Sequence, residues 1–180
     1  VGELWWRRDV YVHKNVGPKK LTVCCPQHTF GKKCSICEEV VRMNRDTDGH
    51  YSEEEIKGLD ISRRTLYFVQ IKGEKGVKLL DMPYSSFGEK LNTEIDDPDN
   101  EGADALAELE NGKWLKCRWK KMNRGTFSFV CLDRLEFTDA PTLDEKVIKG
   151  LDLDACAVET ANAELEKFLE GMSANDDDEP

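Results

Sequence analysis

The sequence predicts a mainly β protein with inserted helices, arranged as a small Greek-key barrel. Five or six short stretches are rich in aromatic and β-branched residues, and turn-forming residues separate them. Helical patterns fall between the middle stretches and again after the last one. The 180 residues are enough for one domain with a hydrophobic core and some appendages.

The N-terminal quarter contains two predicted strands and a cysteine-rich turn. Residues 4–13 ("LWWRRDVYVH") form the first strand, and "NVGP" then turns the chain into a second short strand at 19–25. Residues 38–44, which follow the sequence "CSIC", have the pattern of one or two helical turns. We expect residues 45–55 to form a polar loop.

The middle of the chain alternates strands with helices. Residues 63–73 and 77–82 are predicted strands joined at "EKG". A helix follows at 86–95, where Ser86 and Glu89 have the spacing of a capping box. A short helix is then expected at residues 103–112. A hairpin of residues 113–121 and 126–137, turning at "MNRG", completes the barrel.

The C-terminal segment is predicted to be helical and acidic. Thr142 and Glu145 are placed to cap a short helix that ends at Gly150, and a longer helix is expected at about 153–170. The final residues have almost nothing to bury, so we expect them to be disordered. The predicted domains are a strand-rich core at 1–140 with a metal-binding subdomain at about 13–45, a helical segment at 141–171 and an acidic tail at 172–180.

The net charge of −10 hides an alternation in sign along the chain. Residues 1–80 carry 15 Lys and Arg against 11 Asp and Glu, whereas residues 81–110 carry 1 against 10. Residues 111–140 are basic again, with 7 against 3, and residues 141–180 are acidic, with 3 against 12. Such blocks predict a basic surface built from two regions of the sequence, plus an acidic tail. A polyanion therefore remains a candidate partner.

Four of the seven cysteines lie within the stretch "CCPQHTFGKKCSIC" (24–37). No secretory signal opens the sequence, so a metal site in a reducing compartment is favoured over disulfides. Cys34 and Cys37 supply a Cys-x-x-Cys knuckle, and His13 is the best fourth ligand. Four nitrogen and sulfur ligands suit one structural Zn²⁺ ion, because a closed tetrahedron leaves no open position for water.

The third thiolate is open between two neighbours. Cys25 precedes Pro26 where the strand ends, so its side chain can turn into the knuckle, and we prefer it to Cys24. His28 is the alternative to His13. The remaining alternative is a set of thiols that never meet.

A second metal pattern lies in "NRDTDGHYSEEE" (44–55). Its oxygen-bearing side chains have the spacing of an EF-hand calcium loop; the positions are Asn44, Asp46, Asp48, Gly49 and Glu55. Asn in place of Asp at the first position, the bulky Tyr51 and the lack of a second copy all argue against calcium. The sequence favours a polar turn, so we do not expect Ca²⁺ here.

Two basic stretches, "RRTLYF" and "KWLKCRWKK", combine cationic and aromatic residues, as does the opening "WWRR". Strand alternation places Lys116, Arg118 and Lys120 on one face, and Leu115, Cys117 and Trp119 on the other. Two adjacent tryptophans cannot both face inward, so one of Trp5 and Trp6 should be exposed. Single-stranded nucleic acid is bound by such surfaces, because Lys and Arg follow phosphates while aromatic rings stack on bases. A merely solvated charged face is the alternative.

The order of these motifs resembles a known family. A His, a Cys, the sequence "GKKCSIC", a basic aromatic strand, a helix of the "FGEKL" type and a late basic hairpin also follow one another in the single-stranded DNA-binding, helix-destabilising proteins of T-even-like and related tailed bacteriophages. "TFGKKCSICE" is especially similar. The resemblance covers about residues 3–139. The interval between the His and the first Cys is shorter here than in the T-even protein.

The resemblance implies a five-stranded OB-fold that carries a zinc subdomain and holds single-stranded DNA. It also implies roles in phage DNA replication, recombination and repair, contacts with phage replication proteins through the acidic C-terminal tail, self-association on DNA, and a location in the cytoplasm of the infected bacterial host. The zinc ligands that the resemblance implies are His13, Cys25 (or Cys24), Cys34 and Cys37. The expected DNA-binding residues are Trp6, Arg8, Arg63, Arg64, Tyr67, Lys116, Arg118, Lys120 and Lys121.

Enzymatic activity is not expected. The sequence has no set of nucleophile and base, no phosphate-binding loop and no open metal site. Nor does any apolar run approach the roughly 18 residues that span a bilayer, so no membrane partner is expected. The alternative function is a zinc-knuckle protein-interaction module, or an acidic adaptor that acts on a host protein.

Overall fold

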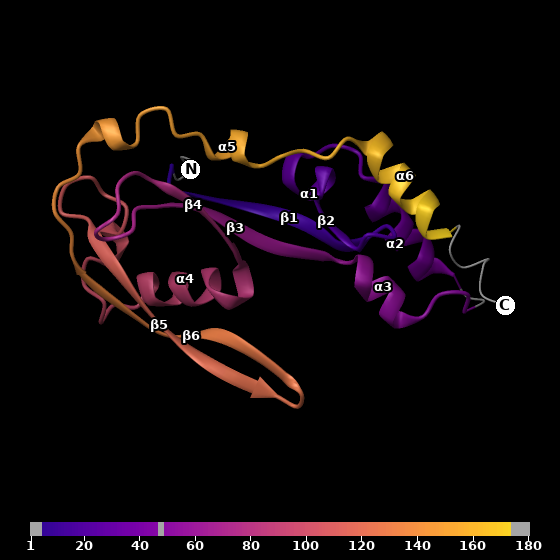
Figure 1. The fold of residues 1–180 in the computed structure, drawn as a ribbon, viewed down its shortest axis with the longest axis horizontal. Coiled ribbons are helices and arrows are strands. Elements are labelled where there is room, and N and C mark those ends of the chain that lie inside the picture. The colour runs from indigo at the N-terminus through magenta and orange to yellow at the C-terminus, as the bar shows by residue number, and fades with distance from the viewer. Residues whose placement is uncertain (1–4, 47–48, 174–180) are drawn as a thin grey trace. The chain divides into compact units, whose positions relative to one another are not determined.

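The computed structural model describes residues 5–46 and 49–173, and it shows a mixture of sheet and helix (Figure 1). The strands are β1 (Arg7–Val16), β2 (Leu21–Cys24), β3 (Ile61–Val69), β4 (Lys78–Pro83), β5 (Lys113–Arg124) and β6 (Phe127–Asp139). The helices are α1 (Pro26–Phe30), α2 (Ser35–Arg45), α3 (Glu53–Leu59), α4 (Gly88–Asp96), α5 (Leu153–Cys156) and α6 (Asn162–Ser173). Short 3₁₀ turns lie at Tyr84–Ser86, Ala103–Ala105 and Glu145–Val147.

The strands form two hydrogen-bonded groups in the described part of the chain. One is a four-stranded sheet with the order β2-β1-β3-β4, and the other is the β5–β6 hairpin. β1 pairs with β2 and β5 with β6, both antiparallel. The expected class of sheet plus inserted helices is therefore confirmed, whereas a closed five-stranded barrel stays a prediction.

The chain divides into two compact units. The first unit comprises residues 1–8 and 65–153, and the second comprises residues 9–64 and 154–180. The division by sequence into residues 1–140, 141–171 and 172–180 stays a prediction, and residues 174–180 lie outside the described part.

The core of the first unit joins β3, α4 and the hairpin. Its buried residues are Tyr67, Phe87, Leu91, Leu132 and Leu135. Phe87 is the N-cap residue of α4, and no side chain caps this helix. The predicted Ser86–Glu89 capping box is therefore wrong, because Ser86 belongs to the preceding 3₁₀ turn. A Cβ on Gly88 would lie 2.7 Å from the Tyr84 ring, so glycine is needed at this close approach.

The core of the second unit is built from β1, β2, α2, α3 and α6. Its buried residues are Val16, Val23, Cys25, Cys34, Ile36, Met43, Leu59 and Leu165. Because cysteines are part of this core, the folding of the unit and the chemistry of its thiols are linked.

Three helical predictions need correction. The expected polar loop at 45–55 ends in α3, whose first turn has a true capping box between Ser52 and Glu55. The helix expected at 103–112 is only a 3₁₀ turn. The long helix expected at about 153–170 is two helices, and Glu159 in the break between them pairs with Lys32 at 2.6 Å.

The β5–β6 hairpin is longer than predicted. Its strands pair in register as far as Arg124 and Phe127, and the turn is Gly125–Thr126 instead of "MNRG". Gly125 has a φ of +60°, a conformation that glycine adopts without strain, so the chain can reverse within two residues.

Candidate metal centre and nucleic-acid interface

Four side chains of the second unit converge on one point. The ligand atoms of His13, Cys25, Cys34 and Cys37 all lie within 4.8 Å of one another. The Nε2 atom of His13 lies 3.5 Å from the sulfur of Cys34 and 3.4 Å from that of Cys37. The sulfurs of Cys25 and Cys37 are 3.5 Å apart. This cluster, formed from β1 and the ends of two helices, could hold a metal ion.

The distances agree with tetrahedral coordination. Zinc–sulfur bonds of about 2.3 Å and a zinc–nitrogen bond of about 2.0 Å separate neighbouring ligand atoms by about 3.5–3.8 Å. Three of the observed separations, at 3.4–3.5 Å, lie at or just below the lower limit of this range, and all of them are within 4.8 Å. Three sulfurs and one imidazole nitrogen are also the donor set of a structural zinc site. The residues present therefore fit such an ion.

Local backbone geometry selects Cys25 over Cys24. β2 ends at Cys24, and Cys25 becomes the N-cap of α1, whose first residue is Pro26. The Cys25 sulfur accepts a hydrogen bond from the backbone N–H of His28. The side chain of Cys24 instead donates to Thr29 Oγ1 at 3.5 Å. Successive side chains on a strand point to opposite faces, which is why only one of the two thiols reaches the cluster.

The knuckle cysteines are placed by the start of α2. Cys34 is the N-cap of this helix, and Cys37 lies three residues later on the same face. A helix N-terminus favours a negative charge, so it suits a thiolate ligand. The pairing of Cys34 with Cys37 therefore follows directly from the spacing of "CSIC".

The orientation of His13 is fixed from its other side. His13 is 1% exposed, and its Nδ1 lies 2.7 Å from the carbonyl oxygen of Leu59. A carbonyl oxygen can only accept, so Nδ1 carries the proton and Nε2 presents its lone pair to the sulfurs. Histidine ligands of metals usually have such a partner. Leu59 is the last residue of α3, a helix that the sequence-based prediction missed.

The thiols cannot all ionise without a cation. A hydrogen bond from Cys25, helped by His13, lowers the pKa of Cys34 to about 3. The same hydrogen bond with Cys34, with burial, raises the pKa of Cys25. Burial raises the pKa of Cys37 to about 11. The three thiols thus oppose one another's ionisation, and a bound metal cation would allow all three to ionise.

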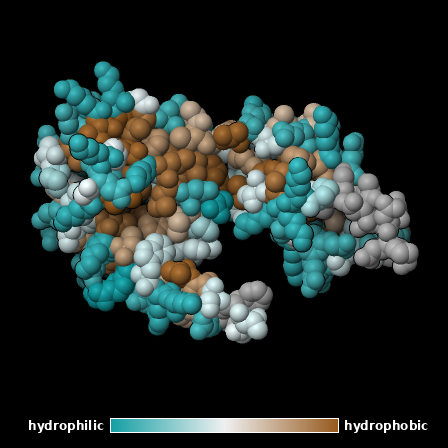
Figure 2. Space-filling view, in the orientation of Figure 1, coloured by the Kyte–Doolittle hydropathy of each residue, from teal (hydrophilic) through white to brown (hydrophobic). Residues whose placement is uncertain are grey.

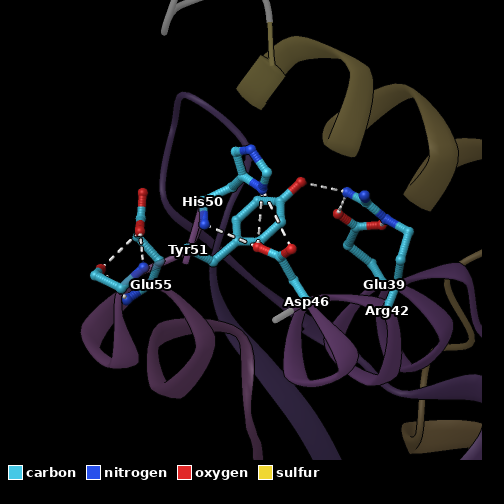
Figure 3. Close-up of polar contacts among 7 residues, drawn as sticks. Glu39, Arg42, Asp46, His50, Tyr51 and Glu55 are labelled. Carbon is cyan, nitrogen blue, oxygen red and sulfur yellow. Dashed lines mark hydrogen bonds and ion pairs between the residues drawn. The ribbon is translucent and has the colours of Figure 1, made fainter. Parts of the chain in front are cut away.

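The segment with calcium-loop spacing has internal partners in Figure 3. Asp46 accepts a hydrogen bond from the backbone N–H of His50 at 2.8 Å, and its carboxylate lies 3.2 Å from the His50 ring. Glu55 belongs to the capping box, where it accepts from Ser52. Asp48, another of the expected oxygen donors, lies outside the described residues. These contacts agree with the polar-turn interpretation.

The register of the hairpin defines its two faces. Lys116, Arg118 and Lys120 share one face, as the alternation predicts, and their cross-strand partners are Glu136, Arg134 and Cys131. We call this the cationic face. The opposite face contributes Leu115 and Cys117 to the core of the first unit. Lys121 is exposed and alternates onto this opposite face.

One carboxylate lies within the cationic face. Glu136 forms ion pairs with Lys116, Arg118 and Arg134. A hydrogen bond from Lys116 and the two arginine charges lower the pKa of Glu136. Alternation along β5 alone predicts a row of lysines and arginines on this face, and their shared partner, Glu136, comes from β6.

Large apolar side chains reach solvent near the free end of the hairpin. Figure 2 shows hydrophobic residues beside hydrophilic ones on its surface. Trp119 stacks on Phe87 with ring centroids 6.3 Å apart, yet it is 44% exposed. Among the hairpin residues whose side chains the structure describes, Met122, Phe129 and Val130 are also exposed. Register places Met122 and Phe129 on the cationic face, opposite each other.

The remaining predicted DNA-binding residues have varied surroundings. Trp5 is exposed, as expected for one of the tryptophan pair, and Trp6 stacks on Tyr67 at 5.9 Å. Tyr67 is only 2% exposed, so it supports the core and does not offer its ring to a base. Arg8 is half-buried on β1.

Two further predicted cations belong to the second unit. Arg63 on β3 is paired with Asp9, and its neighbour Arg64 is half-buried. Like Lys116, Arg63 thus has a carboxylate partner that a phosphate would have to replace.

Among the described residues, no helix combines the length and the apolar character needed to cross a membrane. No protein-family model matches the chain, and the search of curated proteins finds no significant match.

Proposed function

We propose that this chain binds single-stranded DNA through the cationic face of the β5–β6 hairpin. The proposal rests on one observation: cationic and exposed apolar side chains lie on the same face of the hairpin. The cations are Lys116, Arg118 and Lys120, and the apolar pair is Met122 and Phe129. Cationic side chains attract the phosphate backbone of a strand, and an exposed aromatic ring gives a base a surface on which to stack. Neither contact depends strongly on base identity, so binding should be tolerant of sequence.

The shape of the hairpin supports the same function. A two-stranded hairpin is only marginally stable alone. The exposed apolar side chains at its free end are not buried in the protein, so they do not stabilise it. An unpaired strand of DNA supplies the missing contacts, because its bases and phosphates are both accessible. In a duplex the bases are stacked inside, so a preference for single strands follows.

The metal centre has a structural role in this proposal. We assign one Zn²⁺ ion to His13, Cys25, Cys34 and Cys37, which would surround it completely. A closed set of four protein ligands leaves no coordination position for substrate, so the ion would stabilise the second unit instead of performing chemistry. We also assign the chain to the OB-fold class, as its resemblance to the phage proteins implies.

The biological setting is proposed from that resemblance. The chain would protect single strands during phage DNA replication, recombination and repair in the cytoplasm of an infected bacterium, without catalytic activity. Phage replication proteins would bind its acidic C-terminal tail, and self-association on DNA would follow the family pattern. Single-stranded DNA is favoured over an adaptor function because the cationic face also carries exposed apolar side chains.

A titration with oligo-dT tests the proposal. Tryptophan fluorescence should be quenched at low salt, and the affinity should fall as salt increases. Replacing Lys116, Arg118 or Lys120 with Ala should each flatten the log–log salt dependence by about 0.7, because one phosphate contact is lost. Lys146→Ala, which removes the same charge outside the hairpin, is the matched control. Unquenched fluorescence at low salt, or unchanged slopes in all three variants, would place the function elsewhere and favour the adaptor.

A further inference from the structure

The C-terminal helix contacts the metal-binding segment directly. Figure 1 shows α6 beside α2, although more than a hundred residues separate them in sequence. The Oδ1 atom of Asn162, the first residue of α6, accepts two hydrogen bonds from Ser35. One comes from the backbone N–H at 2.7 Å and the other from the hydroxyl at 2.8 Å. Ser35 lies between the ligands Cys34 and Cys37 and is itself buried.

Asn162 supplies a cap that α2 lacks. The first N–H groups of a helix have no partner within the helix, and a polar side chain at the N-cap usually satisfies one of them. The N-cap of α2 is Cys34, which makes no side-chain capping bond because its sulfur turns toward the metal cluster. Asn162 therefore performs the capping role from another helix and leaves the thiol available as a ligand.

The rest of this face of α6 holds Asn162 in place. Glu166, one turn later, accepts hydrogen bonds from Asn162 Nδ2 at 2.8 Å and from the Ser35 hydroxyl at 3.1 Å. Leu165, between them, is 0% exposed and packs in the same core as Cys25 and Cys34. Phe168 packs against that core and lies beside Gly17. Polar and apolar contacts thus fix α6 against the knuckle.

We propose that Asn162 is a positioning residue of the metal centre, and that α6 docking and metal binding stabilise each other. The inference rests on the metal site of the proposed function. Asn162 holds the start of α2, and the start of α2 sets the separation of Cys34 and Cys37. Because linkage between two binding events is reciprocal, a docked α6 raises the affinity for the metal, and a bound metal favours docking by the same factor.

The rate of metal release from the full chain tests this inference. The protein is loaded with zinc, and release is followed by absorbance after addition of an excess of a chromophoric chelator. Removal of a partner in the outer shell of a metal site typically weakens binding about 10–100-fold. We expect Asn162→Ala to release zinc at least about tenfold faster than the original chain. Glu164→Ala is the matched control, since Glu164 is exposed on the same helix.

A second variant separates positioning from a general loss of stability. Ser35→Ala removes the hydroxyl and keeps the backbone N–H. If Asn162 acts through Ser35, the acceleration caused by Asn162→Ala should be smaller in the Ser35→Ala background, because one of the two hydrogen bonds is already absent. Independent effects of the two substitutions would mean that Asn162 acts by some other route. Circular dichroism at saturating zinc checks that each variant is folded.

The outcomes distinguish this inference from the metal assignment. Equal release rates for Asn162→Ala and Glu164→Ala, in a protein that binds one zinc ion, would overturn the role of Asn162 alone. A full chain that binds no zinc would overturn both the metal centre and the linkage. Fast release from Asn162→Ala together with non-additivity in the double variant would support the inference.

Discussion

Lys116 Nζ lies 2.9 Å from Glu136 Oε2 across the β5–β6 hairpin. The same carboxylate is 3.6 Å from Arg134 and 3.9 Å from Arg118. Three cations of one face therefore share a single negative group that the protein provides itself. A phosphate that approaches this face has to compete with Glu136.

Replacing Glu136 with Gln should strengthen binding of oligo-dT several-fold at low salt. The substitution keeps the shape of the side chain and removes the competing charge, so Lys116 and its neighbours become available to phosphate. The advantage should shrink as salt increases, because the Debye length shortens from about 30 Å at 0.01 M to about 8 Å at 0.15 M. Fluorescence titrations at several salt concentrations measure this. Asp144→Asn, outside the hairpin, is the control, and equal affinities for Glu136→Gln and the original chain would refute the idea of competition.

Cys25→Ser should abolish stoichiometric metal binding, whereas Cys24→Ser should leave it intact. The two residues are adjacent, but only the Cys25 sulfur belongs to the ligand cluster. Metal analysis should give about one zinc per chain for the original protein and for Cys24→Ser. Structural zinc contributes on the order of 10 kcal/mol in small metal-dependent units, so Cys25→Ser should also lower the thermal midpoint markedly. The reverse result for the two variants would exchange their roles.

Phe129→Ala should weaken DNA binding with little effect on folding. Phe129 is 47% exposed, so its removal leaves no buried cavity. If a base stacks on its ring, the loss should be about 1–3 kcal/mol of binding free energy. Val158→Ala, at a residue that is 76% exposed, controls for the loss of exposed apolar surface. Oligo-dT titration and thermal unfolding of both variants would measure the two effects, and undiminished affinity in Phe129→Ala would remove this ring from the interface.

Ser52→Ala should destabilise the second unit by about 1 kcal/mol, the usual value of an N-cap. Glu54→Ala, an exposed neighbour in the same turn, should have little effect. Hydrogen bonds from Ser52 lower the pKa of Glu55, so the part that the Glu55 carboxylate contributes is present at neutral pH and is lost as the pH falls through the lowered pKa, whereas the bond from the Glu55 backbone N–H to Ser52 Oγ does not depend on this ionisation. Chemical denaturation at neutral and acidic pH measures the difference. If Ser52→Ala and Glu54→Ala unfold alike at neutral pH, the capping box is not stabilising.

The cysteines of the candidate metal cluster could be predicted because their spacing is local. Cys34 and Cys37 are one helical turn apart, and Pro26 directs Cys25 away from the strand. The partners that support the ligands are remote in sequence, as Asn162 is from Ser35, and no short-range pattern connects them. The carbonyl of Leu59 lies beyond such a pattern, because the polar composition of residues 45–55 predicts a loop and only the spacing of Ser52 and Glu55 indicates the start of α3.

On the hairpin, alternation correctly placed the residues of β5 and could not place those of β6. Leu132 and Leu135 are both buried although they are three residues apart, which a regular strand does not allow. The register shifts between Arg118 and Trp119 of β5, where Asp133 of β6 has no cross-strand partner. This extra residue brings Leu132 and Leu135 to the same face of the hairpin. Bulges of this kind follow from pairing with the neighbouring strand and leave little trace in a single sequence.

Asp133 is an extra residue in β6 that faces no residue of β5, as in a β-bulge. From this residue to the tip, the odd and even positions of β6 exchange sides, so Leu132 enters the interior and Phe129 joins the lysines. The base of the hairpin and its free end can therefore vary separately, and Leu115 and Cys117 at the base are constrained by packing against the core of the first unit. Adding or removing one residue of β6 between Asp133 and the turn would move the side chains from that point to the turn onto the opposite face. The residues at the base of the hairpin would keep their faces.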